Sequence, residues 1–230
     1  MTVAVVTFPG SNCDRDCVTV MRDVVGVRAE HAWHGDCELP AETRAVILPG
    51  GFSYGDYLRA GAMASTSPIM GAVKQFAENG GRVLGICNGF QILCEVGLLP
   101  GALLANRSGQ FICRHVELEV GPQPKGLLAG MKAGQRLILP IAHGEGNYFA
   151  DEETLSRLEQ EGQIALTYTD TDSQGHSAVN GSRRSIAGLV GGPANNVLGL
   201  MPHPERRSES RLGGADGLPL MQALVDGGLK

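Results

Sequence analysis

Short apolar runs alternate with segments of helical spacing along the first half of the chain. Three of the runs are apolar at nearly every position, which is typical of strands that are covered on both faces of a parallel sheet. These runs are Val3–Phe8, Ala45–Leu48 and Gly81–Ile86, and we expect a further strand over Val27–His34. Ser11 and Asp14 form a capping-box-like start for a helix through Val25. A second helix is predicted over Pro68–Asn79, whose apolar residues recur every three or four positions.

The order of these elements is β-α-β-β-α-β-α, counting a helix after the Gly81–Ile86 strand. It predicts an α/β fold, namely a flavodoxin-like, doubly wound and mostly parallel open sheet. Right-handed crossovers would place the loops that follow Leu48 and Ile86 at the same edge of the sheet.

The second half of the chain has a different pattern. Phe111–Val120 alternates apolar and polar residues, as an antiparallel strand does. Further strands are expected over Leu137–Ala142, Ile164–Thr169, Ser185–Val190 and Asn196–Met201, and short helices over Asp151–Gln160 and Leu218–Val225. We therefore expect a few antiparallel strands beside the parallel ones, with residues 1–230 in a single domain.

Charge and hydropathy exclude several classes of function. The 230 residues include 19 Lys and Arg against 24 Asp and Glu, a net charge of −5 without a basic run, so we expect no nucleic-acid binding. No stretch of about 18 apolar residues occurs, so no membrane span is expected. The first eight residues lack the features of a signal peptide, and we expect a cytoplasmic protein.

Six cysteines occur, and without a secretion signal we expect free thiols rather than disulfides. Cys13 and Cys17 are four residues apart, which is not the C-x-x-C spacing of zinc and redox motifs. A zinc site that combines them with His31 and His34 is an alternative, but we expect no metal in this chain.

Cys87 stands between a predicted strand and a predicted helix, within the segment Gly85–Gly89. It takes the place of the serine in the G-x-S-x-G nucleophile elbow, where the glycines permit a tight turn. The N-terminus of the following helix favours the thiolate, which is the reactive form of cysteine. The alternative is a buried structural cysteine at the end of a strand.

His203 lies between two prolines, which hold the backbone extended. Glu205 is two residues further on and should project from the same side. With Cys87 they supply a nucleophile, a base and a carboxylate that orients the base. The backbone N–H groups of Asn88 and Gly51 are the expected oxyanion donors. In isolation, His203 could equally be a turn histidine and Glu205 a surface ion-pair partner.

These motifs carry a family resemblance. Gly85-x-Cys87-x-Gly89-x-Gln91 and Pro202-His203-Pro204-Glu205 resemble the class I (triad-type) glutamine amidotransferases, which have a flavodoxin-like sheet and a Cys-His-Glu triad. Four further blocks resemble the glutaminase subunits of phosphoribosylformylglycinamidine synthases. These blocks are Phe8–Asp14, Pro49–Arg59, Ile86–Gln91 and Ala142–Gly146, and with the triad the resemblance extends from residue 8 to residue 206.

The resemblance implies that glutamine is hydrolysed to glutamate and ammonia through a thioester on Cys87. The ammonia would pass to a large synthetase subunit that uses ATP and Mg²⁺ in purine synthesis, and a small third protein would bridge the two. The resemblance also places Gln91, Gly51 and Phe52 in the glutamine pocket, and His143 and Tyr148 near the partner. The Pro49–Gly51 turn matches neither G-x-x-x-x-G-K-[ST] nor G-x-G-x-x-G, the glycine-rich patterns that bind phosphates and dinucleotides. We therefore expect this chain itself to hold no cofactor.

Two other functions stay open at this point. One is a stand-alone cysteine hydrolase or peptidase with a similar elbow. The other is a regulatory subunit that binds a partner and has a silent site, although such a site has no need of Cys87, His203 and Glu205 together.

Overall fold

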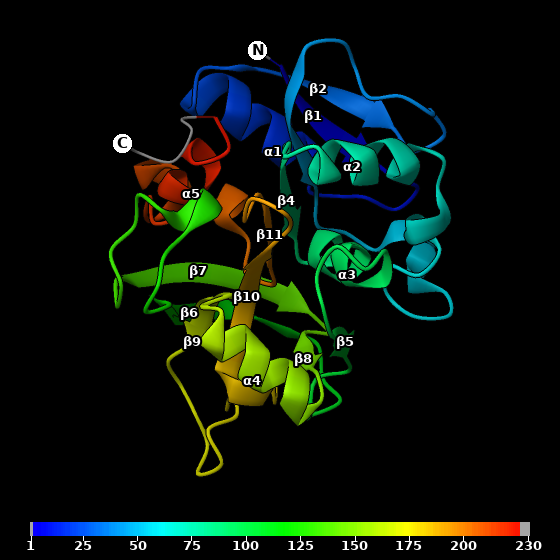
Figure 1. Cartoon of the computed structure of the whole chain (residues 1–230). Coiled ribbons are helices and arrows are strands. Elements are labelled where there is room, and N and C mark those ends of the chain that lie inside the picture. Colours follow the sequence, from blue (N-terminus) through cyan, green and yellow to red (C-terminus); the bar gives the residue numbers. More distant parts are fainter. Residues whose placement is uncertain (1, 226–230) are drawn as a thin grey trace.

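The computed structural model describes residues 2–225 and contains eleven strands and five α-helices in that range. The strands are β1 (Thr2–Thr7), β2 (Arg28–Trp33), β3 (Thr43–Leu48), β4 (Arg82–Ile86), β5 (Ala102–Leu104), β6 (Ile112–Val120), β7 (Arg136–His143), β8 (Asn147–Phe149), β9 (Ile164–Tyr168), β10 (Ile186–Gly191) and β11 (Val197–Leu200). The helices are α1 (Asp14–Thr19), α2 (Ile69–Glu78), α3 (Asn88–Glu95), α4 (Glu152–Gln160) and α5 (Leu218–Gln222). Nine strands form one sheet in the order β2-β1-β3-β4-β11-β10-β9-β6-β7 (Figure 1).

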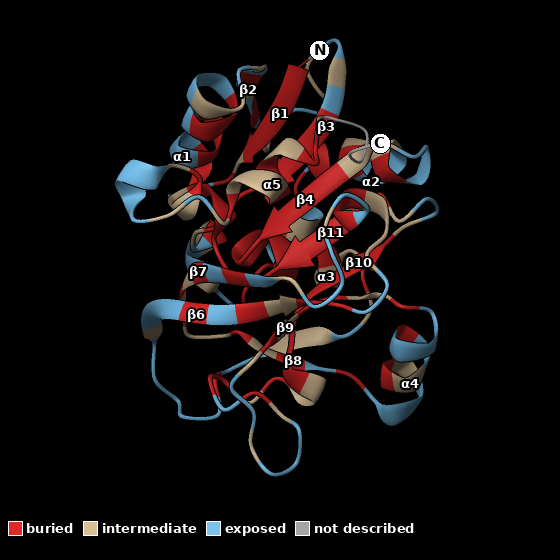
Figure 2. Ribbon diagram, turned by 90° about the vertical axis from the view of Figure 1, so that its left-hand side faces the viewer, coloured by how far each residue is buried: buried red, intermediate tan, exposed pale blue. Residues whose placement is uncertain are grey.

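The first five strands in this order are parallel neighbours. Helix α1 covers one face of these strands, and α2 and α3 cover the other (Figure 2). Most residues of β1, β3, β4 and β11 are buried, as expected for strands with helices on both sides. The predicted flavodoxin-like, doubly wound sheet is therefore confirmed.

The pairing of β4 with β11 positions the candidate site. Leu200, at the end of β11, lies in register with Ile86, at the end of β4. Because the two strands are parallel, the residues that follow them emerge at the same edge of the sheet. Cys87 and His203 are thus brought together although 116 positions separate them in the sequence.

The antiparallel part is larger than expected. Strands β10, β9, β6 and β7 extend the sheet through four antiparallel pairings, as many as there are parallel ones. A separate two-stranded sheet, β5-β8, was not predicted. Each of its strands has only three residues, which is too short to show a period-2 pattern.

The first helix also differs from the expectation. Its α-helical part covers only Asp14–Thr19, and a π-helical segment, Val20–Val24, follows it. No side chain caps its N-terminus. The hydroxyl of Ser11 instead accepts a hydrogen bond from the Phe8 N–H, and the Asp14 carboxylate accepts one from the Thr7 hydroxyl. The predicted capping box is therefore wrong, because groups at the end of β1 engage both side chains instead.

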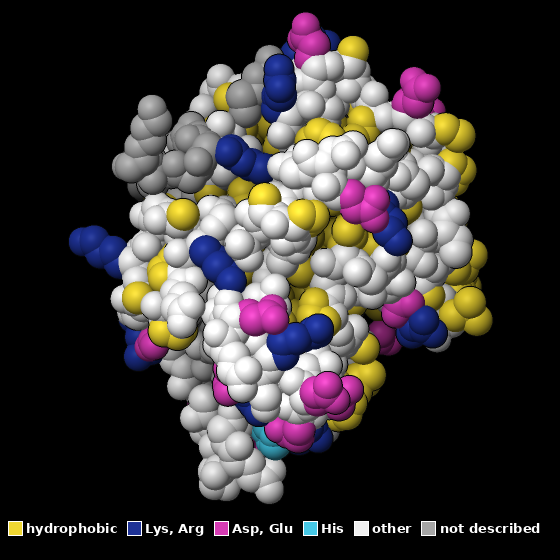
Figure 3. Space-filling view, in the orientation of Figure 1, with side chains coloured by type: hydrophobic (Ala, Val, Ile, Leu, Met, Phe, Trp, Pro, Cys, Tyr) yellow, Lys and Arg dark blue, Asp and Glu magenta, His cyan; other side chains and the backbone are white. Residues whose placement is uncertain are grey.

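The surface and the thiols agree with the composition. On the face shown in Figure 3, Lys and Arg side chains are interspersed with Asp and Glu and do not gather into one basic patch. None of the helices described is both long and apolar enough to cross a membrane. All six cysteines are free thiols, as predicted.

Candidate active site

Cys87 occupies a strained turn between β4 and α3. Its backbone has φ +51° and ψ −104°, a region that residues other than glycine rarely adopt. The Cys87 N–H donates to the Leu200 carbonyl at 2.7 Å, which fixes the turn to β11. A Cβ at Gly89 would lie 1.9 Å from the Leu48 carbonyl oxygen, and one at Gly85 would lie 2.6 Å from the Gly89 carbonyl oxygen. Both glycines are therefore required for close backbone approach, and the predicted tight elbow is confirmed.

His203 and Glu205 form a buried pair beside this elbow. The imidazole Nδ1 lies 2.6 Å from Glu205 Oε1, and both side chains are almost completely buried. Because a carboxylate only accepts, Nδ1 carries the hydrogen and Nε2 is left for other partners. His203 itself is extended, as predicted, but Glu205 lies in a 3₁₀ turn, Pro204–Arg207, so the expectation of an extended segment through Glu205 is wrong.

The electrostatics of His203 fit a base that is readily protonated. Burial alone would lower the pKa of the imidazole. The neighbouring Glu205 carboxylate and Cys87 thiol outweigh it and raise the pKa well above its ordinary value. A protonated imidazole stabilises a thiolate beside it. Because Glu205 is buried, the alternative that it is a surface ion-pair partner is excluded.

The turn that follows β3 lies against the same imidazole. A Cβ at Gly50 would lie only 2.7 Å from His203 Cε1. Gly51 has φ +149° and forms an isolated bridge with Ser11. Within residues 2–225, neither the Gly51 N–H nor the Asn88 N–H donates to another group of the chain. Both stay available to a ligand, and their role as oxyanion donors remains a prediction.

Asn88 and Gln91 hold the start of α3 in place. The Asn88 side chain accepts from the Ser53 N–H and donates to Asp56 Oδ1 and Gln91 Oε1. Gln91 Nε2 donates to the Glu145 carbonyl at 2.7 Å. The Gln91 amide is thus engaged by the protein on both its nitrogen and its oxygen, so a direct contact with substrate would require one of these bonds to open.

Phe52 is the exposed member of the predicted pocket residues. Its side chain is about half exposed, and its ring lies 6.3 Å from that of Phe111. The next turn carries Asp56, whose pKa burial raises to about 6, with a further contribution from Glu145. The segment thus carries an exposed apolar side chain at Phe52 and an ionisable one at Asp56, which is bonded to Asn88.

His143 ends β7 and is held by Asn106, a residue that sequence reasoning missed. Asn106 Nδ2 donates to the carbonyls of Gln110 and His143, so its Oδ1 must be the acceptor. Oδ1 receives the His143 Nδ1–H at 3.0 Å and the Gly146 N–H. Burial, and then the charge of His203, lower the pKa of His143 to about 4. His143 is therefore neutral near pH 7, with a buried Nε2 that has no partner among the described residues.

Tyr148, in β8, is a core residue. Its side chain is fully buried, its hydroxyl donates to the Pro100 carbonyl at 2.9 Å, and its ring stacks on Phe90. Packing behind α3 accounts for this side chain, and the implied position near a partner remains a prediction.

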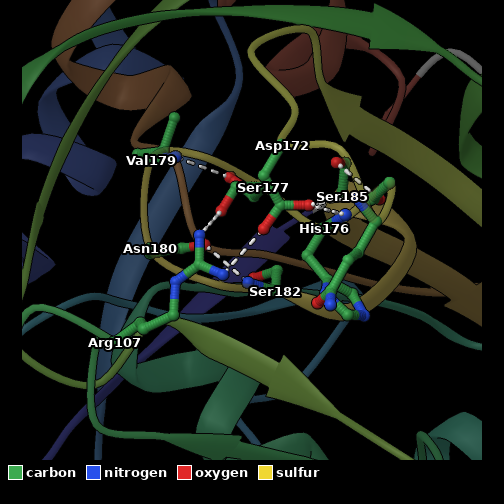
Figure 4. A network of polar contacts seen from close by, with 10 residues as sticks. Arg107, Asp172, His176, Ser177, Val179, Asn180, Ser182 and Ser185 are labelled. Carbon is green, nitrogen blue, oxygen red and sulfur yellow. Dashed lines mark hydrogen bonds and ion pairs between the residues drawn. The ribbon is translucent and has the colours of Figure 1, made fainter.

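The polar loop between β9 and β10 supports the segment after His143. Asn180 Nδ2 and the Ser182 hydroxyl both donate to the Gly146 carbonyl. Figure 4 shows the loop around these residues, with Arg107 reaching Asp172 at 2.7 Å. The loop therefore holds the backbone beside His143 in place through these hydrogen bonds.

The residues do not fit a metal site well. Cys13, His203 and Glu205 place potential ligand atoms within 4.8 Å of one another. His203 and Glu205 are already bonded to each other, however, and Arg206 Nη2 lies 2.9 Å from Cys13 Sγ. A guanidinium cation thus takes the place where a metal would bind. The alternative zinc site has no support either, since His34 bonds to Tyr54.

Comparisons with known proteins agree with this geometry. A family model described as a CobB/CobQ-like glutamine amidotransferase domain matches residues 1–212. The chain is 52% identical to the phosphoribosylformylglycinamidine synthase subunit PurQ of Novosphingobium aromaticivorans, over 98% of this chain and 97% of that relative. It is 50% identical to the protein of the same name from Rubrobacter xylanophilus, over 99% of both.

Two solved structures extend the comparison. A chain of the PurLQS structure from Thermotoga maritima superposes with a TM-score of 0.84 and 40% identity, over 98% of this chain and 97% of that one. The glutaminase domain of Trypanosoma brucei CTPS, solved with bound acivicin, gives a TM-score of 0.62 at 13% identity. At that identity the likeness is one of fold alone.

Proposed function

The chain belongs to the CobB/CobQ-like glutamine amidotransferase family, and from that membership we propose that it is the glutaminase subunit of a phosphoribosylformylglycinamidine synthase. The observation that carries the proposal is the placement of Cys87, on its strained elbow, beside the buried His203–Glu205 pair. The full-length identity to PurQ proteins then selects the member of the family.

In the proposed reaction, the Cys87 thiolate attacks the carboxamide carbon of glutamine. His203 takes up the thiol proton and Glu205 stabilises the resulting imidazolium. The N–H groups of Gly51 and Asn88 donate to the tetrahedral oxyanion. When the intermediate collapses, His203 returns the proton to the leaving nitrogen, and ammonia departs from a glutamyl thioester on Cys87.

Hydrolysis of the thioester completes the cycle. His203, now neutral, removes a proton from water, and the hydroxide adds to the thioester carbonyl. A second oxyanion forms between the same two N–H groups and collapses to release glutamate and the Cys87 thiol. Because the two halves use the same base and the same donors, one rigid site serves both.

The fate of the ammonia is the second part of the proposal. We propose that it passes to a large synthetase subunit, which uses ATP and Mg²⁺ to make formylglycinamidine ribonucleotide, with a small subunit bridging the two in the cytoplasm. The likeness to a chain of the PurLQS structure supports a synthetase partner. No cofactor is proposed for this chain.

Substitution of the nucleophile in the reconstituted complex tests the function. We expect Cys87→Ala to abolish glutamine-dependent synthesis while synthesis from added ammonium persists. Cys94→Ala is the matched control, because Cys94 lies on the adjoining helix and its thiol donates to the Pro100 carbonyl; it should retain both activities.

Three other results would each support a different reading. Loss of both activities in Cys87→Ala would make the cysteine structural. Turnover of peptides or esters by the isolated chain would favour a stand-alone hydrolase. The absence of any glutamyl thioester, even with the partners present, would favour a regulatory subunit with a silent site.

A further inference from the structure

A second group of polar side chains surrounds His203 on its Nδ1 side. Cys13 Sγ lies 3.9 Å from His203 Nδ1, and Arg206 Nη2 donates to that sulfur at 2.9 Å. Arg206 Nε lies 3.7 Å from Glu205 Oε1, the same oxygen that binds His203. The reaction uses neither Cys13 nor Arg206 directly, yet both adjoin the pair that does.

Cys13 is fixed between the base and the turn that carries the proposed oxyanion donor. Its backbone N–H donates to the Gly50 carbonyl at 3.2 Å, and its thiol donates to Asn12 Oδ1 at 3.1 Å. The sulfur is fully buried, and a Cβ at Gly50 would lie 3.1 Å from it. The thiol therefore donates in one direction and accepts from Arg206 in another, which leaves it little freedom to move.

The charges around His203 give Arg206 a second effect. The titratable or charged groups that face the imidazole are Glu205 and Arg206 on its own turn, Cys13 and Asp16 at α1, Cys87 at the elbow and His143 at the end of β7. Arg206 is the one permanent cation in this set. Burial alone would lower the pKa of Arg206, but Cys13 and Glu205 raise it, so the guanidinium stays charged.

We propose that Arg206 and Cys13 are positioning residues of this site: they fix the Glu205 carboxylate against His203, and the guanidinium balances the charge of that carboxylate. Without this cation, Glu205 and Asp16 would hold a proton on His203 more strongly. This change moves the titration of the His203 imidazole to higher pH.

The inference rests on the proposed glutaminase function, and its test is the pH profile of glutamine-dependent synthesis in the reconstituted complex. In Arg206→Gln we expect kcat/KM for glutamine to fall about tenfold at neutral pH, and the limb of the profile that reports the His203 imidazole to move up by about one pH unit. Arg206→Lys keeps the charge, so its limbs should stay near those of the wild type. Synthesis from ammonium should be unchanged in both variants.

Cys13 is tested in combination with Arg206. Cys13→Ala should lower kcat/KM several-fold, and Cys13→Ser, which retains a hydroxyl, should recover part of the loss. The double variant Cys13→Ala/Arg206→Gln should lose little more than Arg206→Gln alone, because the two residues act through one contact.

A readout on the isolated chain separates this inference from the proposed function. The rate of Cys87 alkylation by iodoacetamide, followed by mass spectrometry of the Cys87 peptide, reports its thiolate fraction at each pH. Its pH dependence should change in Arg206→Gln, because the imidazolium that stabilises the thiolate persists to higher pH. Arg207→Gln is the matched control, because Arg207 pairs with Asp216 rather than with the site, and its midpoint should not move.

Two results would overturn the inference. One is an Arg206→Gln profile and alkylation midpoint that coincide with those of the wild type. The other is an equal fall of kcat/KM in Arg206→Gln and Arg207→Gln without any movement of the limbs, which would reduce the guanidinium to a structural role. If Cys87→Ala leaves glutamine-dependent synthesis intact, the proposed function fails instead.

Discussion

A single methyl group at position 50 should separate the chemistry of the site from its fold. The Cβ of Gly50→Ala would lie 2.7 Å from His203 Cε1, whereas ordinary contact starts at 3.4 Å. The imidazole would have to move by about 0.7 Å, the difference between these two distances. Gly50 does not have a positive φ, so its backbone can accept alanine and the strain falls on the ring and on the Cys13 sulfur.

The expected cost follows from that displacement. A misplacement of about 1 Å in a catalytic group can lower a rate by about a hundredfold, so we expect kcat/KM for glutamine to fall by roughly 10- to 100-fold. Overpacking of a close-packed interior costs about 1–3 kcal/mol, which should appear as a lower urea midpoint of unfolding. Synthesis from ammonium in the reconstituted complex should be unaffected, because it does not use His203.

Gly71→Ala is the control for this substitution. Gly71 lies within α2, and a Cβ there would meet nothing within 4 Å. Alanine in a helix interior is favoured over glycine by about 0.5–1 kcal/mol, so this variant should be slightly more stable and fully active. Wild-type kcat/KM for glutamine in Gly50→Ala would refute the placement of the His203 ring, and an equal loss of both synthetic activities would refute the claim that the effect is local.

Three further predictions follow from the geometry. Glu205→Gln should lower kcat/KM for glutamine by roughly 10²- to 10⁴-fold, because the amide no longer stabilises the imidazolium; steady-state kinetics that show less than a threefold change would contradict this. His143 has a folded pKa of about 4, below its unfolded value of about 6.5, so the unfolded chain takes up the proton first as the pH falls. Urea unfolding at pH 6.5 and 4 should therefore show the wild type losing about 2.5 kcal/mol more than His143→Gln, and parallel losses would argue against a neutral buried histidine. Gly89→Ala should destabilise the chain by at least about 3 kcal/mol, since its Cβ would meet the Leu48 carbonyl; an unchanged urea midpoint would show that the elbow has room.

The sequence predicts those parts of the site that depend on local backbone chemistry. The G-x-C-x-G spacing around Cys87 is enough to predict a tight elbow, because the close approach at Gly89 leaves no alternative. The contact between His203 and Glu205 was also expected, although the backbone that makes it is a 3₁₀ turn. A separation of two residues allows contact in both conformations, so spacing alone could not distinguish them.

Residues that act through tertiary contacts were not predictable in the same way. Asn106 orients His143 across 37 positions, and Arg206 reaches Cys13 across 193. Neither has a local pattern that sets it apart from an ordinary surface polar residue. The burial of Tyr148 against Phe90 is likewise a tertiary contact that its local sequence does not indicate.

The order of the strands also constrains when the site can form. Strand β11 is the last in the chain but fills the fifth of the nine places in the sheet, between β4 and β10. During synthesis, β4 and its elbow leave the ribosome more than a hundred residues before β11 and His203 follow them. Until then Cys87 has neither its base nor the carbonyl that fixes its turn. The central strand thus couples the reactivity of Cys87 to the completion of the chain.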